Sequence, residues 1–461
     1  MMAVWNETYL SSINMVSRAD AEYFQPAYNI LETQLYFSNL DKLSHIATIT
    51  DGIHASPEIA DNGIRYISAK CVKNNCFVTE NCITISNRQN SSNLRTQLRE
   101  NDIIITTVGT IGNVAVVDKD ILPSNCDRHV GIIRIKKGMN ISPFYISTFL
   151  NSKYGYFQSF RESAGNVQLN LYIKNIGNIK IPRFSENEEI ISGLTKKAYL
   201  KRKSSNFFYL QAQNFLEKEL GLDKLTFKKS FGNETNFSKT ILSSRIDAEY
   251  FQPQHIKFAK ALKKNASLKG RELYKVKELL RCSPQYGTST KLKYIETGVP
   301  FLRIADLSNL KFDKENLKYI SPKEASGEKS AQVTSDDILI SRSGSLGLTI
   351  RISDELAGSI FGSYFIRLRL NDKVNPQYFS FYMNSLAGKI QVTRYSTGGV
   401  QTNLTIPAIE SFQIVLLRKK KEEQLLDIIT QADDAFKRSL ELLEQAKQQV
   451  ENLIEQASGV A

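Results

Sequence analysis

Two long segments of the chain have the apolar spacing of amphipathic helices. Residues 186–220 contain no Pro and a single Gly, and their apolar side chains recur three or four positions apart. Residues 419–456 keep this spacing over about four heptads, with Ser439 as the one polar residue of the series. Because steps of three and four keep side chains on one helix face, each stripe needs a partner to cover it. The pattern predicts two long helices that pack antiparallel as a coiled coil, each roughly 50 Å long at about 1.5 Å per residue.

The side chains expected to form this helix pairing follow from the two stripes. On the first helix they are Ile191, Leu194, Ala198, Phe208 and Phe215, and on the second they are Leu425, Ile429, Phe436, Leu443, Val450 and Leu453. Lys201 and Ser205 interrupt the first stripe, which predicts weaker or polar packing in its middle.

The rest of the chain alternates short β-rich runs with Gly, Asn and Ser. Residues 102–107, 114–117 and 131–135 are examples, and the same texture returns in the second half of the chain. Such runs predict strands joined by turns, and therefore an α+β fold with two repeated mixed α/β domains. The predicted divisions are a first domain at residues 1–185, a long helix at 186–220, a polar linker at 221–243, a second domain at 244–418 and a second long helix at 419–461.

The two predicted domains are copies of one module. The decamer Ser17-Arg-Ala-Asp-Ala-Glu-Tyr-Phe-Gln-Pro26 returns 227 residues later as Ser244-Arg-Ile-Asp-Ala-Glu-Tyr-Phe-Gln-Pro253, with nine of ten positions identical. Three further pairs of segments follow in the same order, at offsets of 235, 235 and 233 residues. Landmarks that repeat in order indicate an internal duplication. The pairs are residues 63–68 with 298–303, residues 102–112 with 337–347, and residues 163–170 with 396–403.

Charge adds a class of partner to this picture. The 461 residues include 60 Lys and Arg against 47 Asp and Glu, which gives a net charge of +13 and a pI near 9.2. A polyanionic partner is favoured, and nucleic acid or an anionic membrane would both qualify. No apolar run approaches the ~20 residues needed to span a membrane, and the first residues lack the pattern of a secretory signal. We therefore expect a cytoplasmic protein that binds no membrane.

The sequence offers no recognisable catalytic site. The phosphate-binding pattern G-x-x-x-x-G-K-[ST] is not present, because the one Gly-Lys pair, Gly388-Lys389, is followed by Ile. The four His residues form no metal-spaced pair, and the gaps between Cys71, Cys76 and Cys82 do not suit zinc, so we interpret these cysteines as structural thiols. We expect no catalytic residue, no metal site and no cofactor in this chain.

One segment invites comparison with an enzyme motif. Asn375-Pro-Gln-Tyr378 is close to the Asn-Pro-Pro-Tyr motif of amino-methyltransferases. Its counterpart in the first copy is Ser142-Pro-Phe-Tyr145, so the shared feature is a helix cap followed by Pro. We predict that Asn375 caps a helix.

Binding chemistry remains, and it concentrates on matching loops of the two copies. Two pairs of glycines, Gly109 with Gly112 and Gly344 with Gly347, would let the backbone approach a phosphate, although turn geometry alone also explains them. Asn and Gln read adenine edges, and Arg reads guanine. The candidates for base contacts are Asn166, Gln168, Gln401, Asn403, Arg303 and Arg342. The candidates for phosphate contacts are Lys70, Arg128 and Arg394, and the alternative for each of these side chains is a solvated surface position.

Taken together, these landmarks resemble the specificity subunit of type I restriction-modification systems. The strongest local match is Asp337-Ile-Leu-Ile-Ser-Arg-Ser-Gly-Ser-Leu-Gly347 with its twin at residues 102–112, followed by Gly398-Gly-Val-Gln-Thr-Asn-Leu404 and by the decamer. The resemblance covers nearly the whole chain. It implies two target-recognition domains, each reading one half of a bipartite site in double-stranded DNA, held apart by the long helices. A rod of roughly 50 Å corresponds to about 15 base pairs, or one to one and a half duplex turns.

The resemblance also implies partners and cofactors outside this chain. Two adenine-N6 methyltransferase (modification) subunits would dock on it, bind S-adenosylmethionine and flip the target base. Restriction subunits that translocate DNA would use ATP and Mg²⁺. The N-terminal extension, residues 1–16, departs from the commonest family pattern and leaves a type IIB-like system as an alternative. Two further alternatives are a complete DNA methyltransferase or nuclease with degenerate motifs, and a scaffold that touches no DNA.

Overall fold

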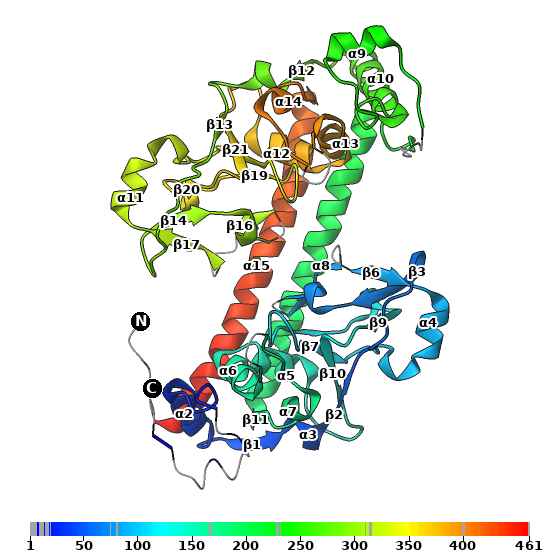
Figure 1. Ribbon diagram of the computed structural model, residues 1–461. Coiled ribbons are helices and arrows are strands. Elements are labelled where there is room, and N and C mark those ends of the chain that lie inside the picture. The colour runs from blue at the N-terminus through cyan, green and yellow to red at the C-terminus, as the bar shows by residue number, and fades with distance from the viewer. Residues whose placement is uncertain are drawn as a thin grey trace. The chain divides into compact units, whose positions relative to one another are not determined.

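The computed structural model divides the chain into two compact units (Figure 1). Unit 1 comprises Met1–Ser205 with Asp434–Ala461, and unit 2 comprises Asn206–Asp433. Both boundaries fall inside a long helix, so each unit contains one part of each long helix. The residues that the structure describes are 7–8, 13, 18, 20–73, 75–79, 82–165, 168–226, 230, 232–308, 310–312, 316–398 and 402–459.

Unit 1 is built around a four-stranded antiparallel sheet. Its strand order is β2 (Ala47–Asp51), β10 (Val130–Ile135), β7 (Ile103–Thr106) and β8 (Val114–Val116). A three-stranded sheet follows the order β6 (Ile83–Ile85), β3 (Ile59–Ile67) and β9 (Ser124–Cys126), with β3 and β9 parallel. A third pair is β1 (Asn39–Lys42) with β11 (Lys180–Arg183), and the helices include α2 (Pro26–Leu35), α5 (Pro143–Leu150) and α6 (Lys153–Glu162).

Strand β7 shows why the run at residues 102–107 contains three consecutive apolar residues, Ile103 to Ile105. Ile103 and Ile105 contribute to one core, which includes Phe149 of α5. Ile104 contributes to a second core, with Ile67 of β3. Because successive side chains of a strand point to opposite faces, a strand that is covered on both faces has consecutive apolar positions instead of an alternation of apolar and polar ones.

Unit 2 repeats this arrangement. Its four-stranded sheet has the order β13 (Gln285–Tyr286), β21 (Phe365–Leu368), β18 (Ile338–Ser341) and β19 (Thr349–Arg351). Its three-stranded sheet has the order β17 (Lys318–Ile320), β14 (Val299–Leu302) and β20 (Ile360–Phe361), with β14 and β20 parallel. The third pair is β12 (Leu273–Lys275) with β22 (Gln413–Val415), and the helices include α10 (Pro253–Leu268), α12 (Pro376–Asn384) and α13 (Leu386–Tyr395). Strand orders therefore correspond one to one between the units, which confirms the repeated domains.

The structure contains the predicted helix cap, and the predicted linker includes a short helix. The side chain of Asn375 accepts hydrogen bonds from the backbone N–H groups of Gln377 and Tyr378, at 2.8 and 3.2 Å, and so caps α12. This cap explains the motif without methyltransferase chemistry. The segment expected as a polar linker contains a short helix, α9 (Phe237–Ser243), that buries none of its residues.

A buried Asp precedes β7 in unit 1 and β18 in unit 2, and each Asp forms an ion pair with an Arg. In unit 1, Asp102 accepts from Arg134 Nε at 2.7 Å and Arg134 Nη2 at 2.6 Å. In unit 2, Asp337 accepts from Arg369 Nε at 2.9 Å and Arg369 Nη2 at 3.3 Å. Each ion pair joins the start of the central strand to the neighbouring strand or the residue just after it, because Arg134 lies in β10 and Arg369 follows β21.

The two long segments form single helices, α8 (Glu186–Leu220) and α15 (Lys419–Ser458), and they pack together as predicted. In unit 1, Ile191 shares a core with Val450, and Ala198 lies in a smaller cluster with Leu443. This order runs in opposite directions along the two helices, so they are antiparallel. In unit 2, Leu216 of α8 shares a core with Leu425 of α15.

The predicted pairing residues differ in how deeply they are buried. Those that are buried are Ile191, Ala198, Leu425, Ile429, Leu443 and Val450, and those that are partly exposed are Leu194, Phe208, Phe215, Phe436 and Leu453. Near the end of α15 the buried residue is Ile454 instead of the predicted Leu453. A straight α-helix drifts by about 20° per heptad from a strict seven-residue repeat, which accounts for this shift by one position.

The buried Asp predicts a large effect on stability. Replacing Asp337 by Ala would leave Arg369 without its carboxylate, which should lower the free energy of unfolding by about 3 kcal/mol, the low end for a buried pair. Urea unfolding of the two proteins measures this difference. Asp372→Ala, an exposed position in the same unit, is the control and should change the free energy by less than about 0.5 kcal/mol. Equal unfolding curves for the wild type and Asp337→Ala would show that the pair is not an anchor.

Candidate functional site

The glycines of the two hairpin loops have left-handed backbones. The φ angles are +78° at Gly109 and +84° at Gly112 in the β7–β8 loop, and +74° at Gly344 and +77° at Gly347 in the β18–β19 loop. A Cβ atom on Gly112 would lie 3.3 Å from Ser159 Cβ of α6, and one on Gly347 would lie 2.5 Å from Val392 Cγ2 of α13. Helix packing therefore explains the second glycine of each loop. A Cβ on Gly109 or Gly344 would meet nothing within 4 Å, so packing does not explain these two glycines and open space lies beside them.

Each hairpin loop is joined to the polar loop that follows α6 or α13. In unit 1, the N–H of Leu171 donates to the carbonyl of Thr107 at 2.9 Å. In unit 2, the N–H of Leu404 donates to the carbonyl of Arg342, also at 2.9 Å. The polar loops are closed by Asn170 and Asn403, whose carbonyls accept from Ala164 at 2.9 Å and from Thr397 at 3.0 Å. We call residues 107–113 with 163–170, and residues 342–348 with 396–403, the loop pair of each unit.

The loop pairs bring together seven of the predicted site residues. Gly109, Gly112 and Gln168 lie in the loop pair of unit 1, and Arg342, Gly344, Gly347 and Asn403 lie in that of unit 2. Gln168 is exposed. Arg342 is half-buried, and its guanidinium lies 4.6 Å from the centre of the Tyr286 ring. Asn166 and Gln401 belong to the same loops in sequence but lie outside the described residues.

The other four predicted residues lie in different elements. Lys70 is exposed in the turn after β3, and Arg303 follows β14, where it pairs with Asp306 at 2.5 Å. Arg128 is exposed beside His129, whose carbonyl accepts from the N–H of Thr107 at 3.0 Å. Arg394 lies on α13, with its guanidinium 4.6 Å from the ring centre of Tyr250 and 5.4 Å from that of Tyr395.

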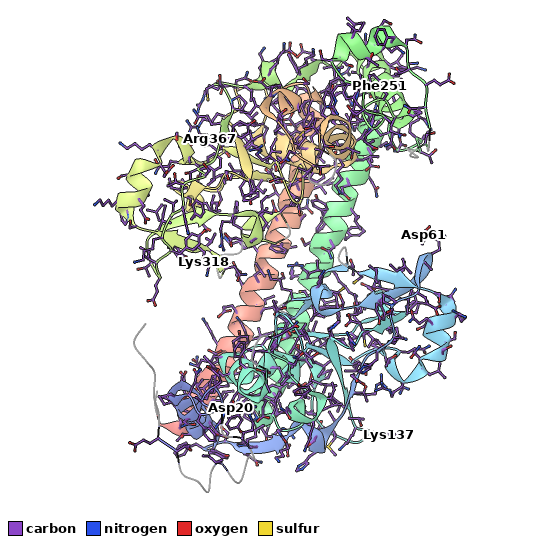
Figure 2. The ribbon with its side chains drawn as sticks, in the orientation of Figure 1. Asp20, Asp61, Lys137, Phe251, Lys318 and Arg367 are labelled. Carbon is purple, nitrogen blue, oxygen red and sulfur yellow. The ribbon has the colours of Figure 1, made fainter. Side chains whose placement is uncertain are left out.

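The repeated decamer holds the polar loop through contacts that the sequence did not identify. In unit 1, Arg18 forms a two-pronged ion pair with Asp20, with both distances 2.8 Å, and its Nη2 donates to the carbonyl of Ser163 at 3.1 Å. Its guanidinium also lies 4.7 Å from the ring centre of Tyr23. The decamer therefore holds the first residue of the polar loop. Asp20 is labelled in Figure 2.

Unit 2 has the same contacts. Arg245 pairs with Asp247 at 2.5 and 2.9 Å, donates to the carbonyl of Ser396 at 3.1 Å and lies 4.9 Å from the ring centre of Tyr250. We call each Arg, Asp and Tyr set an arginine clamp. The identity of the two decamers was visible in the sequence, but the carbonyl that each Arg holds lies about 150 residues away along the chain. Only the folded structure shows that contact.

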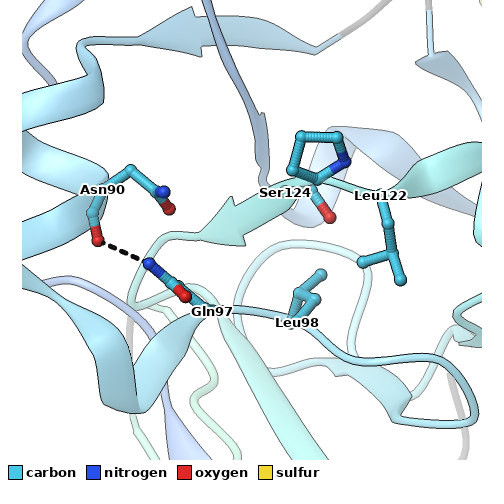
Figure 3. A pocket seen from close by; sticks show the side chains of 6 residues that line it. Asn90, Gln97, Leu98, Leu122 and Ser124 are labelled. Carbon is cyan, nitrogen blue, oxygen red and sulfur yellow. Dashed lines mark hydrogen bonds between the residues drawn. The ribbon is translucent and has the colours of Figure 1, made fainter.

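The described residues contain no group of three or more His, Cys, Asp or Glu side chains that could hold a metal ion. None of the five cysteines forms a disulfide. A cavity of about 370 Å³ in unit 1 (Figure 3) has no ionisable side chain in its lining. Gln97 Nε2 donates there to the carbonyl of Asn90 at 3.0 Å. Within the described part of the chain, no helix is long and apolar enough to cross a membrane.

The comparison with protein families decides the identity. The model of the type I restriction modification DNA specificity domain matches the chain twice, at residues 42–206 and 269–452. The chain belongs to this family. It is a DNA specificity subunit of a type I restriction-modification system, and such subunits are non-catalytic, so the alternative of a complete methyltransferase or nuclease is excluded. The resemblance stated from the sequence motifs is confirmed.

Solved structures resemble the chain at low sequence identity. The type I restriction-modification S subunit from M. genitalium is 12% identical over 91% of this chain and 95% of that one, with a TM-score of 0.42. The HsdS subunit from Thermoanaerobacter tengcongensis is 14% identical over 92% and 97%, with a TM-score of 0.29. A chain from a study of complex assembly and conformational transition of the type I R-M system is 13% identical over 92% and 98%, with a TM-score of 0.30. No curated protein matches the chain.

In this specificity subunit, the arginine clamp of unit 2 depends on the charge of Asp247. The hydrogen bonds from Arg245 lower the pKa of Asp247, and burial opposes this only in part. A carboxylate with a lowered pKa stabilises the fold above the usual Asp range, and the effect is lost as the pH falls through the lowered pKa. The clamp is therefore intact at neutral pH.

Asp247→Asn should release the polar loop of unit 2 at neutral pH. We expect backbone amides 396–398 to exchange about threefold to tenfold faster, as for the loss of one partly exposed hydrogen bond of ~1 kcal/mol. Hydrogen exchange by mass spectrometry measures this, with residues 163–165 of unit 1 as the internal control. Asp20→Asn should give the reverse pattern. Equal exchange in both loops for both variants would contradict the clamp.

Proposed function

We propose that each loop pair reads one half of a bipartite site in double-stranded DNA. The observation that carries the proposal is that both units hold their loops by the same main-chain bonds and the same arginine clamp, while the side chains on the loops differ. Thr107 of unit 1 corresponds to Arg342 of unit 2 at the offset of 235 residues. A shared scaffold with different side chains is what reading two different half-sites requires.

Arg342 is the side chain best suited to read a base in unit 2. An Arg guanidinium donates two parallel hydrogen bonds to guanine O6 and N7. Stacking on Tyr286 limits the positions that the guanidinium can take, and its buried Nε has no hydrogen-bond partner among the described residues. The guanidinium is therefore oriented, with donor capacity left for a ligand.

Unit 1 presents different chemistry at the same place. Asp51 of unit 1 corresponds to Tyr286 of unit 2. The carboxylate of Asp51 pairs with Arg95 at 2.9 Å and with His54 at 2.5 Å. A carboxylate accepts from the amino group of cytosine, whereas Arg is suited to guanine. We infer that the two half-sites differ in sequence, with Gln168 and Asn403 as further candidates for base contacts.

The remaining candidates would position the DNA. We propose that open backbone at Gly109 and Gly344 approaches phosphates, and that Lys70 and Arg128 contribute cationic contacts that carry no sequence information. Arg303 is engaged with Asp306, so we assign it a weaker contribution. We further propose that α8, at roughly 50 Å, sets the separation of the half-sites at about 15 base pairs.

Chemistry in this proposal belongs to other subunits. Two methyltransferase subunits would dock on the chain and use S-adenosylmethionine to methylate adenine N6 in the two half-sites. Restriction subunits would supply ATP- and Mg²⁺-dependent translocation and cleavage. Membership of the type I family supports the proposal of these partners.

Arg342→Ala tests the assignment of a half-site to unit 2. We expect affinity to fall about tenfold to a hundredfold for duplexes with both cognate halves, as for the loss of one two-pronged base contact of roughly 1–3 kcal/mol. Discrimination at one position of one half should be lost, and discrimination in the other half should remain. Fluorescence anisotropy with the methyltransferase present measures both quantities, using duplexes with one half changed.

The matched control for this variant is Arg351→Ala. Arg351 is exposed in β19 of the same unit and lies outside the loop pair. Its replacement by Ala removes the same charge as Arg342→Ala. A loss of discrimination in both halves, or equal losses for Arg342→Ala and Arg351→Ala, would contradict the assignment.

A further inference from the structure

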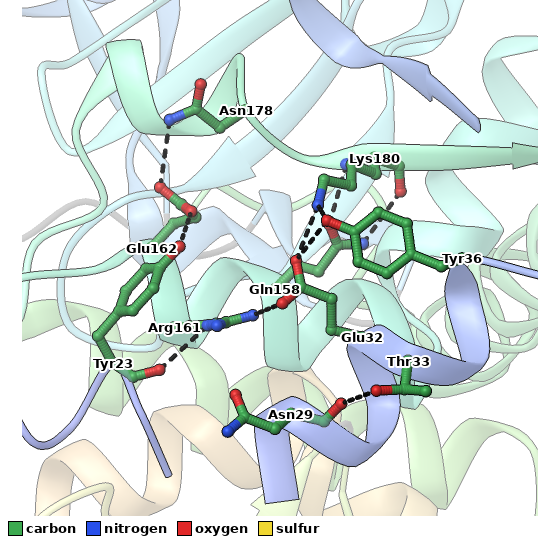
Figure 4. A network of polar contacts seen from close by, with 10 residues as sticks. All are labelled: Tyr23, Asn29, Glu32, Thr33, Tyr36, Gln158, Arg161, Glu162, Asn178 and Lys180. Carbon is green, nitrogen blue, oxygen red and sulfur yellow. Dashed lines mark hydrogen bonds and ion pairs between the residues drawn. The ribbon is translucent and has the colours of Figure 1, made fainter. Parts of the chain in front are cut away.

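The contacts of Arg161 and of its counterpart Arg394 differ between the units. In unit 1 a polar network joins α2, α6 and β11 (Figure 4). Glu32 is at its centre, where its carboxylate accepts from Arg161 Nη1 at 2.5 Å and from Lys180 Nζ at 2.8 Å. Burial raises the pKa of Glu32, but the hydrogen bonds from Lys180 and Arg161 outweigh it, so the pKa is lowered and the carboxylate stays charged.

Unit 2 keeps the cation of this network and loses the carboxylates. Glu32 corresponds to Ala259, Lys180 to Gln413 and Glu162 to Tyr395, whereas Arg161 corresponds to Arg394. Arg394 still stacks on Tyr250, as Arg161 stacks on Tyr23 at 4.3 Å. Its Nε is buried without a hydrogen-bond partner, and no ion pair joins Arg394 to any residue that the structure describes.

A pocket of about 90 Å³ lies where the carboxylate would be. It is lined by residues of α10, α13 and β22, namely Phe258, Ala259, Ile390, Gln391, Arg394, Tyr395 and Gln413. The Ala259 side chain is too short to fill the space that Glu32 takes in unit 1. Ala259, Arg394, Tyr395 and Gln413 are each partly exposed, so the pocket can be reached from solvent.

We propose that this pocket of unit 2 binds a carboxylate, presented by an acidic side chain of a protein that docks on α10 and α13. The volume equals that of roughly three water molecules, far below the ~300 Å³ at which pockets for small metabolites begin. It therefore suits the end of one side chain. A carboxylate matches the planar, two-pronged donor face of a guanidinium, and unit 1 places this group against the equivalent Arg.

The neighbouring charges favour an anion. Lys260 and Lys263 are exposed on α10, next to Ala259 and one turn beyond it. His255 is fully buried beside Arg394, and its pKa is lowered to about 4, first by burial and then by the charge of Arg394. This imidazole is therefore neutral at pH 7, so Arg394 is the cation that lines the pocket. The inference rests on the proposed function only in that a specificity subunit must dock other subunits.

Acetate is a direct probe of the pocket in the full chain. The midpoint of thermal unfolding should be higher in sodium acetate than in sodium chloride at the same ionic strength. Ala259→Glu supplies a tethered carboxylate, so its midpoint should exceed that of the wild type in chloride and should gain nothing further from acetate. Ser267→Glu adds the same charge at an exposed position of the same helix and should keep the wild-type response to acetate.

The reciprocal change is available in unit 1. Glu32→Ala should open a second site beside Arg161 and Lys180, and so enlarge the acetate response. Should this variant fail to fold, Ala259→Glu with its Ser267→Glu control still decides the question. An acetate response in Ala259→Glu equal to that of the wild type, or no response in the wild type, would overturn the proposal.

Binding to the methyltransferase subunit distinguishes an acidic side chain from other occupants. Ala259→Glu should weaken this association at least tenfold, acetate should compete with it in the wild type, and the salt dependence of DNA binding should not change. If Ala259→Glu or Arg394→Gln instead lowers the slope of log K against log salt by about one, a DNA phosphate occupies the pocket and the docked side chain is excluded. If half-site discrimination fails while acetate still binds, the DNA-reading proposal is wrong and the carboxylate pocket stands.

Discussion

The structure depends on the apolar contact between α8 and α15. Each unit completes its core with side chains from both helices, since Ile191 and Val450 share the core of unit 1 while Leu216 and Leu425 share that of unit 2. Unit 1 therefore needs the last helix of the chain to be complete. Burial of apolar surface is the main favourable term in folding, so this contact ties the N-terminal half of the protein to its C-terminus.

The contacts that hold the loops are the same in the two units, whereas the side chains on the loops differ. The Asp102–Arg134 pair and the arginine clamp recur with the same geometry in unit 2, and both fix the backbone. Thr107 and Arg342, by contrast, occupy equivalent backbone positions in the two units but have different side chains. A second difference between the units lies outside the loops. Ala259 of unit 2 stands where unit 1 has Glu32, and in our proposal this change creates a surface for a partner.

The sequence predicted the scaffold well and the site only in part. Helical spacing predicted α8 and the pairing of the long helices, and repeated landmarks predicted two equivalent domains. Side-chain types near the glycine motifs identified Arg342, which lies in a loop pair, and also Arg303, which is engaged with Asp306 in another turn. Composition and spacing could not separate these two, because which loops meet is decided by contacts between residues far apart in the chain. The clamp of Arg18 on Ser163 and the pocket at Arg394 were invisible for the same reason.

The central claim is that two units read two separate halves of one DNA site. Long-read methylation mapping of cells that express the chain with its cognate methyltransferase tests it most directly. The account predicts methylated adenines in two different specific sequences, separated by an unspecified spacer of fixed length, with centres about 15 base pairs apart. A single continuous motif, or two identical halves with variable spacing, would contradict it.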